Sequence, residues 1–196
     1  SHGFVAYKLG DHTAKLMGRL TLNPIAHIDP VGTILMPIML LVLTNGQFVF
    51  GYAKPVPINP MNFKNPRKDM AISAAAGPVT NILLAVASVL VLKYVLSPLS
   101  YVLSADISAT VMTPLIMIFQ SSVAVNVVLA SFNMIPIPPL DGGRVLTGLL
   151  PYRQAASFSR IEPYGFFIVI FLIVTGIANY FVMPIVNLFL SILQVF

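Results

Sequence analysis

Phe132-Asn133-Met134-Ile135-Pro136-Ile137-Pro138-Pro139-Leu140-Asp141-Gly142-Gly143-Arg144 closes a run of 34 uncharged residues, 107–140, and places a carboxylate directly after it. An apolar run of this length belongs in a lipid bilayer, where an ionisable group costs roughly 2.5–3.5 kcal/mol even on insertion scales. Its three prolines cannot continue a helix, because each lacks an N–H group and disfavours helical backbone at the residue before it. We therefore expect an extended chain here that presents Asp141 from a turn, either at the membrane interface or bound to a cation.

The composition predicts a multi-pass membrane protein of the all-α class, a polytopic helical bundle. Hydrophobic residues make up 57% of the 196 residues and charged residues only 9%, whereas soluble domains carry about 25% charged residues. The net charge of +5 does not predict nucleic-acid binding, because the basic residues are scattered between apolar segments. The chain has no cysteine, so any metal ligand must be His, Asp or Glu.

Two segments are predicted to cross the lipid bilayer as helices. Met70–Leu96 ends at Ser97-Pro98, and Ile107–Met134 precedes the proline-rich stretch. After Glu162 a further run of 34 uncharged residues is interrupted at Gly176 and Pro184; it forms either two short helices or one kinked span. Without internal repeats or low-complexity tracts, residues 1–196 are predicted to form a single domain.

Residues 18–63 are predicted to form a re-entrant, partly membrane-dipping region with a small β element. Val31–Leu43 is too short to span about 30 Å of hydrocarbon as a helix. Residues 19–24 alternate in a way that suggests a short strand, and Gln47–Tyr52 is strand-like after the Asn45-Gly46 turn signal. Before this region, residues 1–15 are predicted to be the end of a helix that is broken at Gly10-Asp11.

The basic residues on the two sides of the predicted spans indicate the orientation. Only one lysine lies between the spans, whereas a set of seven basic residues is expected on one face, which the positive-inside rule makes cytoplasmic. These residues are Lys54, Lys64, Arg67, Lys68, Arg144, Arg153 and Arg160.

Asp141 would need partners to hold a metal. Zinc accepts imidazole and carboxylate, and a catalytic zinc keeps three protein ligands and a water. The chain offers His2, on a helical segment, together with His12 and His27. His12 is expected at the surface, and His27 is expected either to cap a loop or to support a ligand from outside. A third ligand would lie one helical turn before His2, where the printed sequence has not begun.

Four stretches in the same order resemble the site-2 protease family of intramembrane zinc metalloproteases, peptidase family M50. Ser1-His2-Gly3 with residues 5–11 resembles the tail of a His-Glu-x-x-His helix, and residues 18–30 resemble the segment that follows it. Ala76-Gly77-Pro78-Val79-Thr80-Asn81 resembles the central Gly-Pro-x-x-Asn helix, and residues 133–144 resemble the Asn-x-x-Pro…Asp-Gly motif.

The resemblance implies that His2 is the second zinc-ligating histidine, that Asp141 is the third ligand, and that Asn81 contacts the substrate backbone. It implies zinc as the cofactor, transmembrane proteins as substrates and a bacterial inner-membrane location, and the strand-like region could pair with an unwound substrate helix. The first histidine and the glutamate of the motif do not occur in residues 1–196, where Glu162 is the sole glutamate. We expect a fragment that lacks its first helix, and with it the catalytic glutamate, and that is inactive alone.

Simpler interpretations exist for each residue. Asp141 before two glycines is a common turn residue, His2 could be an ordinary helix histidine, and Asn81 could bridge helices. Arg144 could pair with lipid phosphate or with a carboxylate of a loop. For the whole protein, the alternative is an inactive membrane scaffold or chaperone with the protease fold. A transporter is disfavoured because the sequence has no repeat symmetry.

Overall fold

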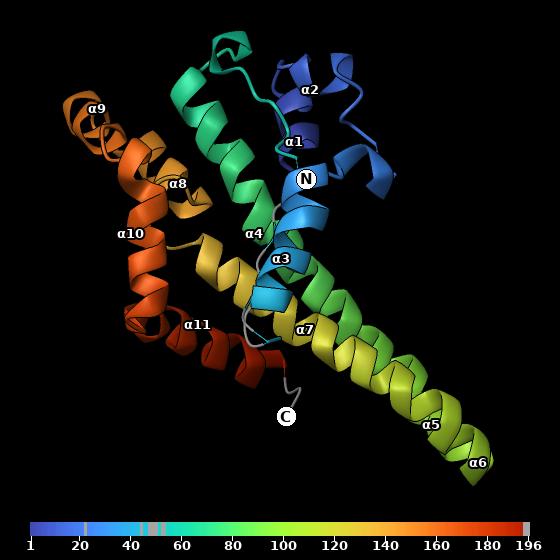
Figure 1. The fold of residues 1–196 in the computed structure, drawn as a ribbon. Coiled ribbons are helices and arrows are strands. Elements are labelled where there is room, and N and C mark those ends of the chain that lie inside the picture. Colours follow the sequence, from blue (N-terminus) through green and yellow to red (C-terminus); the bar gives the residue numbers. More distant parts are fainter. Residues whose placement is uncertain (22, 44, 47–50, 52–53, 194–196) are drawn as a thin grey trace. The chain divides into compact units, whose positions relative to one another are not determined.

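A computed structural model describes residues 1–196 except 22, 44, 47–50, 52–53 and 194–196. The chain divides into two compact units, Ser1–Asp69 (unit 1) and Met70–Phe196 (unit 2). The prediction of a single domain is not tested by this division, and each unit is described by itself. The described residues form helices and no strand, which confirms the helical class (Figure 1).

Unit 1 is built from short helices. The α-helices α1 and α2 come first, a 3-10 turn η1 and a π-helical segment η2 lead into α3, and a second 3-10 turn, η3, precedes the first residues of α4. Their bounds are α1 His2–Lys8, α2 Thr13–Leu16, η1 Pro24–His27, η2 Pro30–Leu35, α3 Met36–Leu43 and η3 Pro60–Asn62. As predicted, the first helix breaks at Gly10, whose φ of +111° suits glycine.

The three helical segments of unit 1 designated η begin in the same way. An Asn or Asp precedes a proline, and its side-chain oxygen accepts backbone N–H groups of the first turn: Asn23 from Ile25 at 3.0 Å, Asp29 from Gly32 at 2.7 Å and Asn59 from Met61 at 3.1 Å. An Asx residue satisfies the N–H groups that a helix start leaves unpaired, and proline at the first position has no N–H to satisfy.

The β element predicted in residues 18–63 is not found in the part of the chain that the structure describes. Where a short strand was predicted, the chain leads into η1, because the Asn23-Pro24 cap starts a helical turn instead. The strand-like segment Gln47–Tyr52 lies largely outside the described residues. Asn45 and Gly46 do turn, with φ of +50° and +79°.

Asp11 ties the two ends of unit 1 together. Its side chain is 0% exposed and accepts four hydrogen bonds from neutral groups. Oδ1 accepts the Thr13 N–H at 3.0 Å, the Thr13 hydroxyl at 2.5 Å and the Asn62 amide at 2.8 Å, and Oδ2 accepts the Asn59 N–H at 2.7 Å. Burial by itself raises the pKa of the Asp11 carboxyl, but these hydrogen bonds outweigh it and lower the pKa to about 2.

Substituting Asp11→Asn is expected to loosen unit 1 at neutral pH. Because the pKa is lowered from its usual 3.8, the carboxylate stabilises the fold above that pH, and the stabilisation is lost as pH falls toward 2. Hydrogen exchange at the Thr13 and Asn59 amides should be roughly 30-fold faster in the variant at pH 7, equivalent to ~2 kcal/mol. The exposed Asp106→Asn control should leave it unchanged. Equal protection in D11N would mean that the carboxylate charge does not hold these loops.

Two long helices dominate unit 2 and lie where the two membrane-spanning helices were predicted. The first runs through α4 Pro66–Val91, the π-helical η4 Leu92–Leu96 and α5 Ser97–Val102; the second runs through α6 Ala105–Ile107, η5 Ser108–Met112 and α7 Thr113–Asn133. Both are long and apolar enough to cross a membrane. The prediction that Ser97-Pro98 ends the first span is wrong, because Pro98 lies in the first turn of α5, where its missing N–H costs little.

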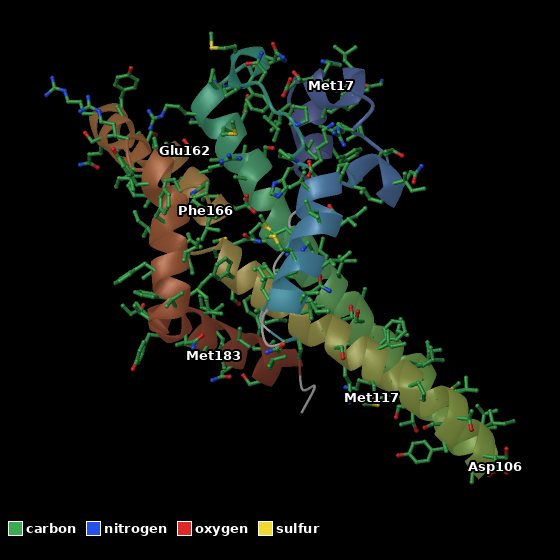
Figure 2. The ribbon with its side chains drawn as sticks, viewed as in Figure 1. Met17, Asp106, Met117, Glu162, Phe166 and Met183 are labelled. Carbon is green, nitrogen blue, oxygen red and sulfur yellow. The ribbon has the colours of Figure 1, made fainter. Side chains whose placement is uncertain are left out.

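Polar side chains join the two long helices within their apolar surroundings. The Ser88 hydroxyl of α4 and the Ser122 hydroxyl of α7 are hydrogen-bonded at 3.0 Å, and within α7 the Asn126 amide donates to the Ser122 carbonyl at 2.8 Å. A polar pair between helices, such as Ser88 and Ser122, holds them together in lipid, where apolar contacts alone have little preference for one another. At the far tip of the pair lies Asp106 (Figure 2).

The last four helices follow Asp141 directly. They are α8 Asp141–Leu149, α9 Tyr152–Ser159, α10 Glu162–Val174 and α11 Ile177–Leu193. Gly176, with φ of +74°, separates α10 from α11, so the alternative of two short helices is confirmed over one kinked span. Unit 2 buries a core formed by α4, α7, α11 and the loop before α8: Ala85, Val123, Val127, Ile135, Val182 and Val186.

Large apolar side chains also cover the outside of unit 2. Leu83, Met117 and Phe167 are each more than 60% exposed. Met117 projects from α7 (Figure 2). Large exposed apolar side chains in this number suit lipid and would be a liability in water.

Candidate metal centre

Asp141 is presented at the start of a helix. Helix α7 ends at Asn133, the chain crosses the prolines in tight turns, and α8 begins at Asp141. The Ile137 N–H donates to the Ile135 carbonyl at 2.8 Å, and the Leu140 N–H donates to the Ile137 carbonyl at 2.9 Å. The path is non-helical, as the prolines require, but it turns tightly where an extended chain was predicted, and Asp141 begins a helix and is not left in a turn. A carboxylate there is favoured by the helix dipole.

The two glycines after Asp141 let α8 lie directly against this loop. A Cβ at Gly142 would overlap the carbonyl oxygens of Met134 and Ile135, and a Cβ at Gly143 would overlap the backbone of Pro138. Both glycines are buried. Because the obstructing atoms belong to the backbone, no side-chain rotation could relieve the overlap. The glycines therefore fix the loop, and with it the position of Asp141.

Gly165 of helix α10 packs against the same loop. A Cβ there would overlap the Pro138 carbonyl and the Pro139 ring, and Gly165 is buried. Near it, Arg144 pairs with Glu162 at 3.7 Å across α8 and α10. Of the two partners left open for Arg144, the structure therefore gives a carboxylate. With both side chains roughly half exposed, this pair adds little stability.

Asn81 lies on helix α4, next to a break in its hydrogen bonding. Pro78 is inside the helix and cannot donate to the carbonyl four residues earlier, while the Thr80 hydroxyl bonds back to the Ala76 carbonyl at 2.7 Å. Beside this segment is an almost wholly apolar cavity of about 260 Å³ that α7 and α11 complete. It is lined by Pro78, Val79, Ile82, Leu83, Ala130, Ser131, Met134, Ile185 and Phe189.

His2 is the first residue of α1 and is half-buried. The helix packs closely within unit 1 through Gly3, where a Cβ would lie 2.8 Å from Val56 Cγ1 and 3.3 Å from Ala14 Cβ. The other two histidines are engaged as the sequence predicted. His12 is exposed and its Nδ1 lies 2.9 Å from the Gly10 carbonyl, and His27 Nε2 lies 3.1 Å from the Thr21 carbonyl.

The predicted site residues are divided between the two units. His2 belongs to unit 1, whereas Asn81 and Asp141 belong to unit 2, so the pairing of imidazole and carboxylate stays a prediction. Among the described residues no three His, Asp or Glu side chains form a group that could hold a metal ion. Imidazole and carboxylate are nevertheless donors that zinc accepts, and His2 with Asp141 would supply two of the three protein ligands of a catalytic site.

Two features of the structure were not found by sequence reasoning. The contact of Gly165 with the proline loop joins residues far apart in the chain, and its only signal is a glycine inside an apolar helical run. Asp11 was recognised as part of a helix break, but two of its four hydrogen bonds come from residues about 50 positions away, Asn59 and Asn62.

Comparison with known proteins gives one family. The model of peptidase family M50 matches residues 2–176. "Putative zinc metalloprotease YwhC" of Bacillus subtilis (strain 168) is 40% identical over 187 residues, which cover 95% of this chain and 79% of that protein. "Putative zinc metalloprotease Rip2" of Mycolicibacterium smegmatis is 27% identical, and that of Mycobacterium tuberculosis (H37Rv) 26%; the chain spans 62% and 61% of their lengths. No solved structure matches the chain significantly.

Proposed function

This chain belongs to peptidase family M50. From that membership we propose that it functions in an intramembrane zinc endopeptidase, which hydrolyses peptide bonds in or near transmembrane segments of other proteins. The names of its relatives support a zinc metallopeptidase. The observation that carries the intramembrane part is the position of Asp141. It follows an apolar helix long enough to span a bilayer, and it begins a helix directly after a loop that is fixed by backbone contacts.

His2 and Asp141 are the proposed zinc ligands. When bound, zinc supplies a Lewis acid and lowers the pKa of water toward neutrality. The two side chains would hold the metal, and the metal would in turn compensate the carboxylate at the edge of the apolar region. We assign no general base within residues 1–196, since Glu162 is paired with Arg144.

Asn81 and the apolar cavity that neighbouring residues of α4 help to line are the proposed contacts for the substrate. A peptide that enters the bilayer in an unwound state has N–H and C=O groups that find no water there. The Asn81 amide can both donate to and accept from such a backbone, and the cavity lined by α4, α7 and α11 offers space for an apolar side chain. We propose a bacterial cell membrane, with the basic loops in the cytoplasm, as the location.

A chelator experiment distinguishes this function from an inactive scaffold or chaperone with the same fold. The protein produced from its complete gene would be reconstituted with a pool of single-span peptides that carry central helix-breaking residues, and products would be read by mass spectrometry. We expect cleavage within the spans that 1,10-phenanthroline stops and added zinc restores. Binding of peptides without cleavage, at full zinc occupancy, would support the scaffold instead.

A further inference from the structure

A hollow of about 520 Å³ lies in unit 1, away from the proposed zinc ligands. It is formed by the end of α1, the break that follows it and the residues around the start of α4. Its lining is Tyr7, Lys8, Leu9, Gly10, His12, Lys64, Asn65 and Asp69. No part of the proposed reaction uses these side chains.

The hollow is positively charged. Lys8 and Lys64 line it with exposed side chains. A third cation, Lys15, is held at its rim, because Lys15 Nζ donates to the Tyr7 hydroxyl at 3.0 Å and lies 4.7 Å from the centre of the Tyr7 ring. The Lys15 amine accordingly lowers the pKa of the Tyr7 hydroxyl.

The one carboxylate in the lining does not offset these cations within the hollow. Asp69 is buried, at 8% exposure, and its Oδ2 accepts the Asn65 N–H at 2.9 Å. A side chain near the helix start that reaches back to an unpaired N–H acts as a cap. Asp69 therefore caps the start of α4, and the lysine amines face the solvent.

The position of the hollow along α4 sets its depth in the membrane. Lys64 lies two residues before α4 begins at Pro66, and residues 71–92 of the same continuous helix carry no charge. Since an apolar helix places its uncharged part in hydrocarbon, Lys64 lies at the level of the lipid headgroups. Tyr7 and Leu9 give the hollow an amphipathic lining, and tyrosine is favoured at this level.

We propose that this hollow binds the phosphate headgroup of an anionic phospholipid. Two lysine amines on a hollow at headgroup depth attract the single negative charge of a phosphodiester, and Tyr7 and Leu9 can contact the glycerol and the first methylenes of the acyl chains. The bound lipid would hold the end of α1 at the membrane surface. A soluble phosphate compound shares the charge but not the apolar part, and the experiment below separates the two.

The test measures lipid binding by the full protein, stripped of zinc so that the result is independent of proteolysis. Native mass spectrometry would titrate dioleoylphosphatidylglycerol against dioleoylphosphatidylcholine. We expect one phosphatidylglycerol to bind preferentially. The double variant Lys8→Gln/Lys64→Gln should weaken its binding about 30-fold, since each basic residue near an anionic surface contributes about fivefold.

Matched variants control for folding and for general charge. Lys8→Arg/Lys64→Arg should retain binding, and Lys93→Gln, at the other end of the same long helix, should bind phosphatidylglycerol as the wild type does. The proposal is overturned if the double glutamine variant binds phosphatidylglycerol with unchanged affinity. It is also overturned if inorganic phosphate or glycerol phosphate competes at the lipid's own affinity, which would indicate a soluble ligand.

Discussion

Asp141→Asn is expected to reduce peptide hydrolysis by more than about 100-fold in the protein produced from its complete gene. Even groups that only orient a zinc ligand contribute 10–100-fold to metal affinity or activity, and the loss of a ligand should exceed that range. Asparagine has nearly the same shape as aspartate, so the close packing of the following glycines against the loop should persist. The effect should therefore come from charge and ligation.

Zinc content and turnover of the single-span peptides measure this prediction together. The matched control is Asp106→Asn, which removes a carboxylate from an exposed position at the tip of the two long helices (Figure 2) and should leave both readouts unchanged. If Asp141→Asn kept full zinc content and near-normal turnover, Asp141 would be a helix-starting residue only, and the simpler interpretation would stand.

Gly165→Ala is the second change with a large expected effect, although it adds only one methyl group. That methyl would overlap the Pro138 carbonyl, so the loop before Asp141 has to move. Inserting a group into a packed region costs typically 1–3 kcal/mol, and the displacement should be passed to the carboxylate three residues along. We expect at least tenfold weaker zinc binding and a lower unfolding temperature.

A second glycine near the same helix separates loop displacement from general destabilisation. Gly176, just after α10, has φ of +74°, and a Cβ there would meet nothing within 4 Å. Gly176→Ala should cost about 1 kcal/mol or more through its backbone conformation and leave zinc affinity unchanged. Equal zinc affinity in both alanine variants would show that α10 does not position Asp141.

The sequence predicts the two long apolar helices well because their signal is local. A run free of charge and long enough for the bilayer has few alternatives, and both long helices lie where the charge-free runs predict them. The end of the first span was misplaced because proline was taken as a stop, although it is tolerated where a new helical turn begins. The prediction of a short strand over residues 19–24 was wrong for a related reason, because Pro24 also begins a helical turn, which Asn23 caps.

The parts of the candidate site that sequence reasoning could not supply depend on contacts between distant residues. The prolines and glycines around Asp141 indicate an irregular loop, but only the structure shows that Gly165 rests on it. Likewise, nothing near Arg144 in the sequence distinguishes a lipid phosphate from Glu162 as its partner. The ligand roles of His2 and Asp141 come from a motif and from family membership, and they remain predictions.

Anomalous scattering at the zinc edge, from crystals of the protein produced from its complete gene, tests the central proposal most directly. We predict one zinc peak, with a ring nitrogen of His2 about 2.0–2.1 Å from it and a carboxylate oxygen of Asp141 about 2.0–2.2 Å from it. The assignment of both ligands would be contradicted by a zinc peak that neither side chain binds. It would also be contradicted if the two side chains lay more than roughly 8 Å apart, which is too far for bonds to one ion.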